Sequence, residues 1–407
     1  MIPVKPHTAT SSDESLSGVN DAQRHIAIYI YGPSGGGATR RTLTLAGGFA
    51  QRGHRVDLVV VDAEGPLAGG LREGVRLVVL DSALIRLAGR KRRRRIKASS
   101  FALARYLRRE RPDVLLSAAN HVHLTAVIAA RLSRAPVRVV LRVSNHLTGS
   151  HLGDSKRPRP NRLKFARRVY GRADAAIAVS QGIADDIVEH TALSRKQVYA
   201  VTNPTYTPEI DSAAAAPLDH PWLSAGSPPL LLAAGRLAPA KDFATLLRAF
   251  ARVHARRPAR LVILGEGGQR RILEQLLHEL GIEADVELHG FVDNPFAWMS
   301  RASLFVLSSA WEGSPGVLVE AMACGCPVVS TNCPSGPDEI LDGGRYGRLV
   351  PVGDDAALAE AIAAMLDTTI DREVLRARAR EFDVDHAVER YLDVLLGGIC
   401  SPGFTIQ

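Results

Sequence analysis

Short runs of apolar residues alternate with longer amphipathic segments along most of the chain. Continuous apolar runs, such as residues 26–31 (IAIYIY) and 230–234 (LLLAA), are typical of strands that are buried on both faces of a sheet. Segments with apolar positions at helical spacing follow many of these runs, and this alternation predicts an α/β fold with parallel sheets. The predicted strands cover residues 26–31, 55–61, 75–80, 113–118, 137–143, 197–202, 230–234 and 304–307, and another begins at 327. The predicted helices cover residues 40–52, 100–109, 120–134, 243–256, 354–366 and 383–396.

One break in this pattern predicts two domains. The chain has 407 residues, which exceeds an ordinary single domain. Residues 205–229 are rich in proline, alanine and serine and lack periodicity, as expected of a connection between domains. We therefore expect a disordered leader at 1–24, an N-terminal domain at 25–205, a linker at 206–229, a C-terminal domain at 230–382 and a final helical segment at 383–407.

The composition narrows the class of protein. Hydrophobic residues make up 46% of the chain, enough for two cores, yet no apolar run is long enough to predict a transmembrane helix. Residues 1–24 lack the hydrophobic segment of a signal peptide, and four cysteines fit a reducing compartment. We therefore expect a cytoplasmic protein. Cys324, Cys326 and Cys333 lack zinc-ligand spacing and a nearby histidine, so we interpret them as buried thiols.

A basic run at Arg90–Lys97 (RKRRRRIK) contributes to the net charge of +9. It follows the apolar residues Leu84, Ile85 and Leu87, a combination that favours a membrane surface. Three interpretations stay open: an anionic membrane or acceptor, a solvated loop, and nucleic acid. No aromatic residues interleave with the arginines, which argues against stacking on single-stranded nucleic acid.

Candidate chemistry concentrates between the strand at 304–307 and the strand that begins at 327. A loop containing Glu312 and Pro315 leads into a predicted helix that contains Glu320. Proline suits the first turn of a helix, and Gly316 lets a ligand approach the backbone closely. Free N–H groups at the start of this helix would favour an anion. We therefore predict an anion site between two acidic side chains.

Other strand ends carry residues suited to the same ligand. Arg236 and Lys241 follow the strand at 230–234, where a guanidinium and an ammonium group can hold a diphosphate. A glycine-rich loop at 32–39 follows the first strand, but alanine at position 38 takes the place of the lysine of a phosphate-binding P-loop. His121 and, as a second choice, His123 follow the strand at 113–118, where side chains point into the ligand crevice.

The E-x7-E spacing of Glu312 and Glu320, with the following GCPVV turn, resembles the retaining nucleotide-sugar glycosyltransferases of family 4 (group 1). The segments GGGATR at 35–40 and GR-x4-K at 235–241 extend the resemblance over nearly the whole chain. It implies a GT-B fold, in which two Rossmann-like β/α/β domains face each other across a deep cleft. It also implies that the final helical segment crosses back onto the first domain.

The resemblance assigns expected roles to individual residues. The expected catalytic residues are Glu312 and His121, which would contact the transferred sugar, and Arg236 and Lys241, which would hold the diphosphate. Glu320 would accept hydrogen bonds from the ribose hydroxyls. The expected donor-binding residues are Gly36, Gly37, Arg40, Gly265, Phe291, Val292, Ser314, Pro315, Gly316, Val317, Leu318 and Glu320.

The resemblance also implies a function. A hexose or N-acetylhexosamine would pass from a UDP-sugar to a lipid-linked, lipopolysaccharide or capsule-type glycan with retention of anomeric configuration, at the inner face of the cell membrane. Because fixed cations can stabilise the leaving diphosphate, we expect no divalent metal, no cofactor and no nucleic-acid partner. The alternatives are a GDP-mannose-dependent enzyme of the same fold and a non-catalytic or nucleic-acid-binding protein that reuses it.

Overall fold

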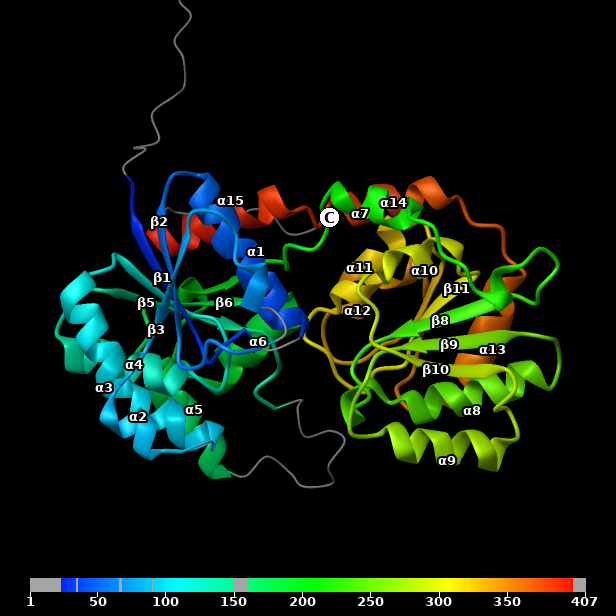
Figure 1. Ribbon diagram of the computed structural model, residues 1–407, viewed down its shortest axis with the longest axis horizontal. Coiled ribbons are helices and arrows are strands. Elements are labelled where there is room, and N and C mark those ends of the chain that lie inside the picture. The colour runs from blue at the N-terminus through cyan, green and yellow to red at the C-terminus, as the bar shows by residue number, and fades with distance from the viewer. Residues whose placement is uncertain (1–22, 34–35, 66–67, 90, 149–159, 398–407) are drawn as a thin grey trace, which may run out of the picture.

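The structure is a computed structural model that describes residues 23–33, 36–65, 68–89, 91–148 and 160–397. It contains two lobes that lie side by side, each built around a parallel sheet with helices on its faces (Figure 1). The first sheet has the strand order β3-β2-β1-β4-β5-β6-β7, and the second has the order β10-β9-β8-β11-β12-β13. The predicted fold class, two Rossmann-like α/β units, is confirmed.

The first lobe forms where the apolar runs of the N-terminal half become buried strands. All six residues of β1 are buried because helices cover both faces of the sheet. Its strands are β1 (His25–Ile30), β2 (Arg55–Val60), β3 (Val75–Val79), β4 (Val114–Ser117), β5 (Arg138–Val143), β6 (Ala175–Ala178) and β7 (Val198–Ala200). Its helices are α1 (Gly37–Gln51), α2 (Ala83–Leu87), α3 (Arg92–Glu110), α4 (His123–Ser133), α5 (Pro160–Tyr170) and α6 (Gln181–His190).

The second lobe repeats this plan with its own core. Its strands are β8 (Leu230–Ala234), β9 (Arg260–Leu264), β10 (Val286–Gly290), β11 (Leu304–Leu307), β12 (Val328–Thr331) and β13 (Arg348–Val350). Its helices are α8 (Phe243–His254), α9 (Arg270–Leu280), α10 (Phe296–Arg301), α11 (Gly316–Ala323), α12 (Pro337–Leu341), α13 (Asp355–Leu366) and α14 (Arg372–Arg380). The last helix, α15 (Val384–Leu396), packs against α1 of the first lobe.

Two segments differ from the sequence-based expectation. Residues 206–229 are not a plain linker, because they contain α7 (Glu209–Ala215), whose Ile210 is buried in the core of the second lobe. Helix α3 begins at Arg92 rather than at residue 100, so the described part of the basic run from Arg92 onward is helical and not a loop. Most of the expected leader and the end of the final segment lie outside the described residues.

A network of hydrogen bonds connects α15 to the junction between the lobes. Arg142 on β5 is fully buried and donates to the hydroxyl of Tyr391 on α15 at 3.0 Å. The same guanidinium donates to Asn203 at 2.6 Å, and the Asn203 amide donates to the carbonyl of Ser314 in the second lobe at 3.4 Å. The returning helix is therefore linked, through two side chains, to the loop that precedes α11.

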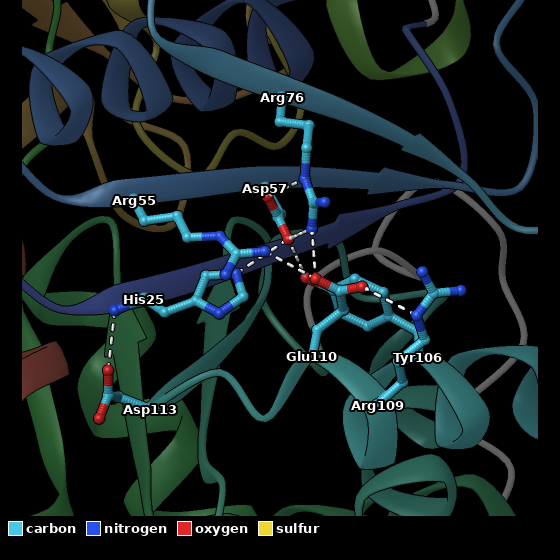
Figure 2. Close-up of polar contacts among 8 residues, drawn as sticks. All are labelled: His25, Arg55, Asp57, Arg76, Tyr106, Arg109, Glu110 and Asp113. Carbon is cyan, nitrogen blue, oxygen red and sulfur yellow. Dashed lines mark hydrogen bonds and ion pairs between the residues drawn. The ribbon is translucent and has the colours of Figure 1, made fainter.

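A second network lies at the amino-terminal edge of the first sheet, away from the strand ends that carry the candidate chemistry (Figure 2). Asp57 is fully buried and accepts hydrogen bonds from His25 at 2.8 Å, from Arg76 at 2.7 and 2.5 Å, and from Tyr106 at 2.5 Å. Glu110 accepts a further bond from Arg76 at 2.8 Å. Burial raises the pKa of the Asp57 carboxyl, but these donors outweigh burial and hold the pKa well below its usual range.

Candidate active site

A cavity of about 240 Å³ opens where the carboxyl ends of strands from both lobes meet. Its walls follow β1, β4 and β5 of the first sheet and β8 of the second, which are the places where parallel sheets bind ligands. The polar and glycine residues in the lining are Tyr31, Gly32, Gly36, Gly37, Thr39, Thr42, Arg92, Asn120, His121, Ser144, Asn145 and Arg236. Three of the expected catalytic and donor-binding residues of the first lobe, Gly36, Gly37 and His121, therefore line the same space as Arg236.

Lys241 and Glu312 form an ion pair beside this cavity. The Lys241 Nζ lies 2.5 Å from Oε1 of Glu312, and the hydroxyl of Ser309 donates to the same oxygen at 2.7 Å. Their side chains are 20% and 15% exposed, so the pair is only partly screened by water. In this structure the Lys241 ammonium and the Glu312 carboxylate neutralise each other. A donor that bound to both would have to break this ion pair and replace it with its own contacts.

Glu320 is also paired, with a residue that the sequence analysis did not select. Arg41 on α1 of the first lobe forms an ion pair with Glu320 on α11 of the second lobe, and the two side chains are 11% and 12% exposed. The guanidinium lies against Gly316, since a Cβ atom added there would be 2.6 Å from Nη2 of Arg41. The side chain of Arg40, the expected donor-binding residue, is exposed instead.

Arg236 reaches toward the glycine loop of the other lobe. A Cβ atom added to Gly36 would lie 3.6 Å from its Nη2 atom. Within the described ranges, no carboxylate lies within ion-pair distance of Arg236, in contrast to Lys241 and Arg41. Arg236 can therefore accept an anion without first giving up a carboxylate, unlike Lys241 and Arg41.

His121 faces the cavity as a neutral imidazole. Arg92 lies 2.6 Å from its Nε2 atom and stacks over the ring of Tyr31, with 4.9 Å between the guanidinium carbon and the ring centre. Desolvation and the charge of Arg92 lower the pKa of His121 to about 4, so the ring is uncharged near neutral pH. Because Nε2 accepts from Arg92, Nδ1 carries the proton and can donate to a ligand.

His123, the second choice, does not reach the cavity. Its side chain is buried in the first lobe, and its Nδ1 atom lies 2.8 Å from the hydroxyl of Ser117. Burial lowers its pKa to about 3. The two histidines differ because His123 is the first residue of α4 and points into the core, whereas His121 precedes the helix.

The remaining expected donor-binding residues lie in the second lobe and differ in how far they are exposed. Gly265 has a φ of +137° and packs so closely on the carbonyl of Gly235 that no side chain fits there. Phe291 is 70% exposed directly after β10, whereas Val292 is partly buried against the second core. Ser314 and Pro315 precede α11, Val317 is half-buried, and the side chain of Leu318 is buried, so only the main chain of Leu318 is left for a ligand.

Further contacts join the lobes around the site. The Glu339 carboxylate on α12 accepts hydrogen bonds from the backbone N–H groups of Gln181 and Gly182 at 2.8 and 3.0 Å. These amides are at the start of α6 in the first lobe, where a negative charge is favourable. Gly313 packs directly on the carbonyl of Ser144, which leaves no room for a side chain. The lobes are therefore in contact at the start of α6 and at Gly313, in addition to the Arg41–Glu320 pair.

The three cysteines close to the site are buried thiols, as interpreted from the sequence. Burial raises the pKa of Cys324, Cys326 and Cys333 to about 12 in each case, which keeps them protonated at neutral pH.

No helix among the described residues combines the length and the apolar character that a transmembrane span requires.

Comparison with known families and proteins agrees with this arrangement. Residues 35–207 match the model of Glycosyltransferase Family 4, and residues 228–368 match the model of Glycosyl transferases group 1. Over 233 residues the chain is 32% identical to the N-acetylgalactosamine-N,N'-diacetylbacillosaminyl-diphospho-undecaprenol 4-alpha-N-acetylgalactosaminyltransferase of Campylobacter jejuni, covering 56% of this chain and 62% of that protein. The match thus spans less than two thirds of that relative.

Other relatives have names that indicate different glycans or lipids. The chain is 28% identical over 373 residues to the lipopolysaccharide core biosynthesis glycosyltransferase LpsE of Rhizobium meliloti, covering 88% of this chain and 96% of LpsE. It is 31% identical over 245 residues to a phosphatidyl-myo-inositol mannosyltransferase of Propionibacterium freudenreichii, covering 57% of this chain and 58% of that protein.

Solved structures share the fold. The crystal structure of the Anabaena protein HepE in complex with UDP-glucose has a TM-score of 0.73 and 20% sequence identity, and the match covers 92% of this chain and 100% of HepE. The two facing α/β lobes and the two matched family models together show that this chain belongs to the group 1, family 4 glycosyltransferases of the GT-B fold.

Proposed function

We propose that this glycosyltransferase moves a hexose or N-acetylhexosamine from a UDP-sugar to a lipid-linked or lipopolysaccharide-type glycan, with retention of anomeric configuration. The observation that carries this proposal is the set of cations around the interlobe cavity, with Arg236 already open to an anion. The diphospho-undecaprenol glycan of the Campylobacter relative and the lipopolysaccharide core of the Rhizobium relative support the acceptor class, and the UDP-glucose complex of HepE supports the donor class.

The proposed chemistry depends on stabilising a leaving diphosphate. When the bond between the anomeric carbon and the phosphate oxygen breaks, negative charge grows on the diphosphate. Arg236, Lys241 and the N–H groups at the start of α11 would stabilise that charge. The acceptor hydroxyl would attack the anomeric carbon on the face that the diphosphate leaves. The hydroxyl proton would pass to the departing phosphate oxygen, so the scheme needs no protein base.

Two side chains would orient the sugar in this scheme. Glu312, once Lys241 turns to the phosphate, would accept hydrogen bonds from sugar hydroxyls. Neutral His121 would donate from Nδ1 to a sugar oxygen, since Arg92 already occupies its Nε2 atom. Contact between the lobes would exclude water and so limit hydrolysis of the donor.

The donor is tested by binding. Isothermal titration with UDP, GDP and ADP, followed by their common sugar conjugates, should give the tightest binding for UDP and a UDP-sugar. The mannosyltransferase relative favours GDP-mannose as the second candidate, and tighter binding of GDP-mannose would replace the UDP proposal. If no nucleotide bound to the folded protein, the glycosyltransferase proposal itself would fail. The anomeric configuration of the product, read by NMR, tests retention.

The proposal includes transfer without a divalent cation, because fixed cations surround the expected position of the diphosphate. The rate of transfer in excess EDTA should remain within about twofold of the untreated rate. A loss of activity that magnesium restores would contradict this part of the scheme. The donor-binding isotherm in EDTA separates a metal needed for binding from a metal needed for the chemical step.

We also propose that α2 and α3 rest on an anionic membrane. Leu87 is 83% exposed and Phe101 is 62% exposed on these two adjoining helices. Arg93, Arg94 and Lys97 are exposed on α3, so apolar anchors and cations occur on neighbouring helices. Arg92 and Arg95 of the same run are left out of this surface, because their side chains have partners within the first lobe. Arg92 contacts His121, and Arg95 pairs with Asp62 at 2.8 Å.

Liposome sedimentation tests the membrane proposal. Replacement of Arg93, Arg94 and Lys97 by glutamine should reduce association with phosphatidylglycerol vesicles by about tenfold or more. A control variant with Arg271, Arg345 and Arg348 replaced by glutamine loses the same charge from the second lobe and should bind as the parent does. Equal losses in both variants would point to net charge rather than to this surface.

A further inference from the structure

We propose that Arg41 is a donor-binding residue that exchanges partners when the donor enters. Before binding, its guanidinium holds Glu320; after binding, it holds the donor diphosphate and leaves Glu320 to the ribose hydroxyls. This inference rests on the proposed nucleotide-sugar donor. It adds a first-lobe residue to a diphosphate site otherwise built from the second lobe.

The position of the guanidinium carries the proposal. Arg41 comes from α1, yet its side chain crosses the cleft and reaches Glu320 on α11. Its Nη2, Cζ and Nε atoms would lie 2.6, 3.4 and 3.4 Å from a Cβ atom on Gly316. The whole guanidinium therefore lies against the first residue of α11, beside the backbone that the proposed function assigns to the diphosphate.

The charges of the site explain why the exchange is favourable. A cation over the start of a helix is opposed by the helix dipole, and here the Glu320 carboxylate offsets that cost. A diphosphate at the same position would be attracted by Arg41, by the helix start and by Arg236 together. Glu320 would then accept hydrogen bonds from two neutral hydroxyls, so each buried charge keeps a partner throughout.

The exchange requires the Arg41–Glu320 ion pair to break, and a ligand without phosphate gives Arg41 no new partner. Uridine would need the Glu320 carboxylate for its ribose, but it offers no anion to Arg41. UDP offers both the ribose and the diphosphate. Removal of the Arg41 charge should therefore have opposite effects on the two ligands, which a loss of structure would not produce.

The test compares uridine and UDP binding to Arg41→Gln by isothermal titration. We expect UDP to bind about tenfold more weakly, because one charge-assisted contact is lost. Uridine should bind severalfold more tightly. Arg41→Lys, which keeps the charge, should retain more UDP affinity than Arg41→Gln. The control, Arg131→Gln, removes an exposed arginine charge from α4 of the same lobe and should change both affinities by less than twofold.

A second background identifies the partner of Arg41. In Glu320→Gln, the further change Arg41→Gln should weaken UDP binding by more than about tenfold, because the phosphate contact is lost and no release of Glu320 offsets that loss. It should no longer tighten uridine binding, because the competing carboxylate is absent. Parallel losses for both ligands, or an unchanged UDP affinity, would overturn the proposal for Arg41.

The wild-type titrations separate this proposal from the proposed function. If the protein binds GDP rather than UDP, guanosine and GDP replace uridine and UDP in the same comparison. If wild-type protein binds a nucleoside diphosphate but Arg41→Gln shows no opposite response, only the Arg41 exchange fails. If the folded wild-type protein binds no nucleoside diphosphate, both proposals fail together. Thermal unfolding of each variant verifies that it is folded.

Discussion

Charged side chains gather in two places, at the amino-terminal edge of the first sheet and in the cleft between the lobes, but the two groups are built differently. At the amino-terminal edge, Asp57 has no exposure and accepts four hydrogen bonds from side chains of its own lobe. In the cleft, the Lys241–Glu312 and Arg41–Glu320 pairs keep 11–20% of their side-chain surface exposed. The second of these pairs joins the two lobes.

This difference in exposure distinguishes the Asp57 network, which stabilises the fold, from the two cleft ion pairs, which a ligand can reach. No molecule from solution can replace the donors around Asp57, because the carboxylate is inaccessible. Each charge in the cleft can find a new partner in a phosphate or a hydroxyl. We therefore expect changes at the sheet edge to alter the free energy of unfolding, and changes in the cleft to alter binding and turnover.

The largest effect should come from Asp57→Asn. This change removes the charge that His25, Arg76 and Tyr106 surround, and it should lower the free energy of unfolding of the first lobe by about 3 kcal/mol. Denaturant unfolding measures the loss. The affinity for the donor nucleotide should stay within twofold at 25 °C. Glu110→Gln, at the edge of the network, should cost about 1 kcal/mol or less.

Lys241→Ala should have nearly as large an effect, but on turnover. Loss of a fixed cation next to the leaving diphosphate should lower kcat by about a hundredfold, with the unfolding temperature unchanged. Steady-state kinetics with the identified donor provides the measurement. Lys196→Ala, which removes an exposed lysine of the first lobe, serves as the control. A wild-type rate for Lys241→Ala would remove this residue from the site.

A smaller effect should appear in the pH dependence of the unfolding free energy, to which Asp57 at the sheet edge contributes. The pKa of Asp57 is depressed in the folded state, so its contribution is complete above its unfolded pKa of about 4 and declines as the pH falls. The difference in unfolding free energy between wild type and Asp57→Asn should therefore shrink by about 1 kcal/mol between pH 5 and pH 3. A difference that stayed constant over this range would show that the charge contributes nothing.

The smallest effect should come from Glu339→Gln, at a contact that belongs to the lobe interface but not to the ligand site. The change removes the negative charge at the start of α6 and should favour separation of the lobes. We expect the dissociation constant of the donor nucleotide to rise about threefold. The neighbouring exposed residue offers a control, Asp338→Asn, which should leave the constant unchanged.

The fold was predictable because its strands are continuous apolar runs between polar loops. The strand predicted at 230–234 is β8 with the same limits, and the first strand differs by one residue at each end. The start of α3 was missed because Arg92–Lys97 contains one buried apolar residue, Ile96, among charges. Helix α7 was missed because a segment of seven residues is too short to show the helical period in its apolar positions.

The position of the candidate residues in the fold could be predicted where a motif follows a strand, and not where side chains cross between the lobes. Arg236 and Lys241 lie in the connection after β8, and Glu312 lies in the loop after β11, so their place at the carboxyl ends of the strands follows from the fold. Arg40 and Arg41 are adjacent on one helix, and a helix turns about 100° per residue, so their side chains leave on different faces. Only the position of the second lobe determines which of the two arginines faces Glu320.

Helix α3 has a consequence for how an acceptor could be presented. Its first residue, Arg92, contacts His121 in the cavity, while Arg93, Arg94 and Lys97 point outward within about 8 Å of helix length. If those outward cations lie among lipid headgroups, the reaction centre lies close to the plane of the bilayer. A glycan chain only a few sugars long could then be extended while its lipid stays embedded. Longer chains would have to fold back toward the headgroups, which would set an upper limit on the acceptor length that this enzyme extends efficiently.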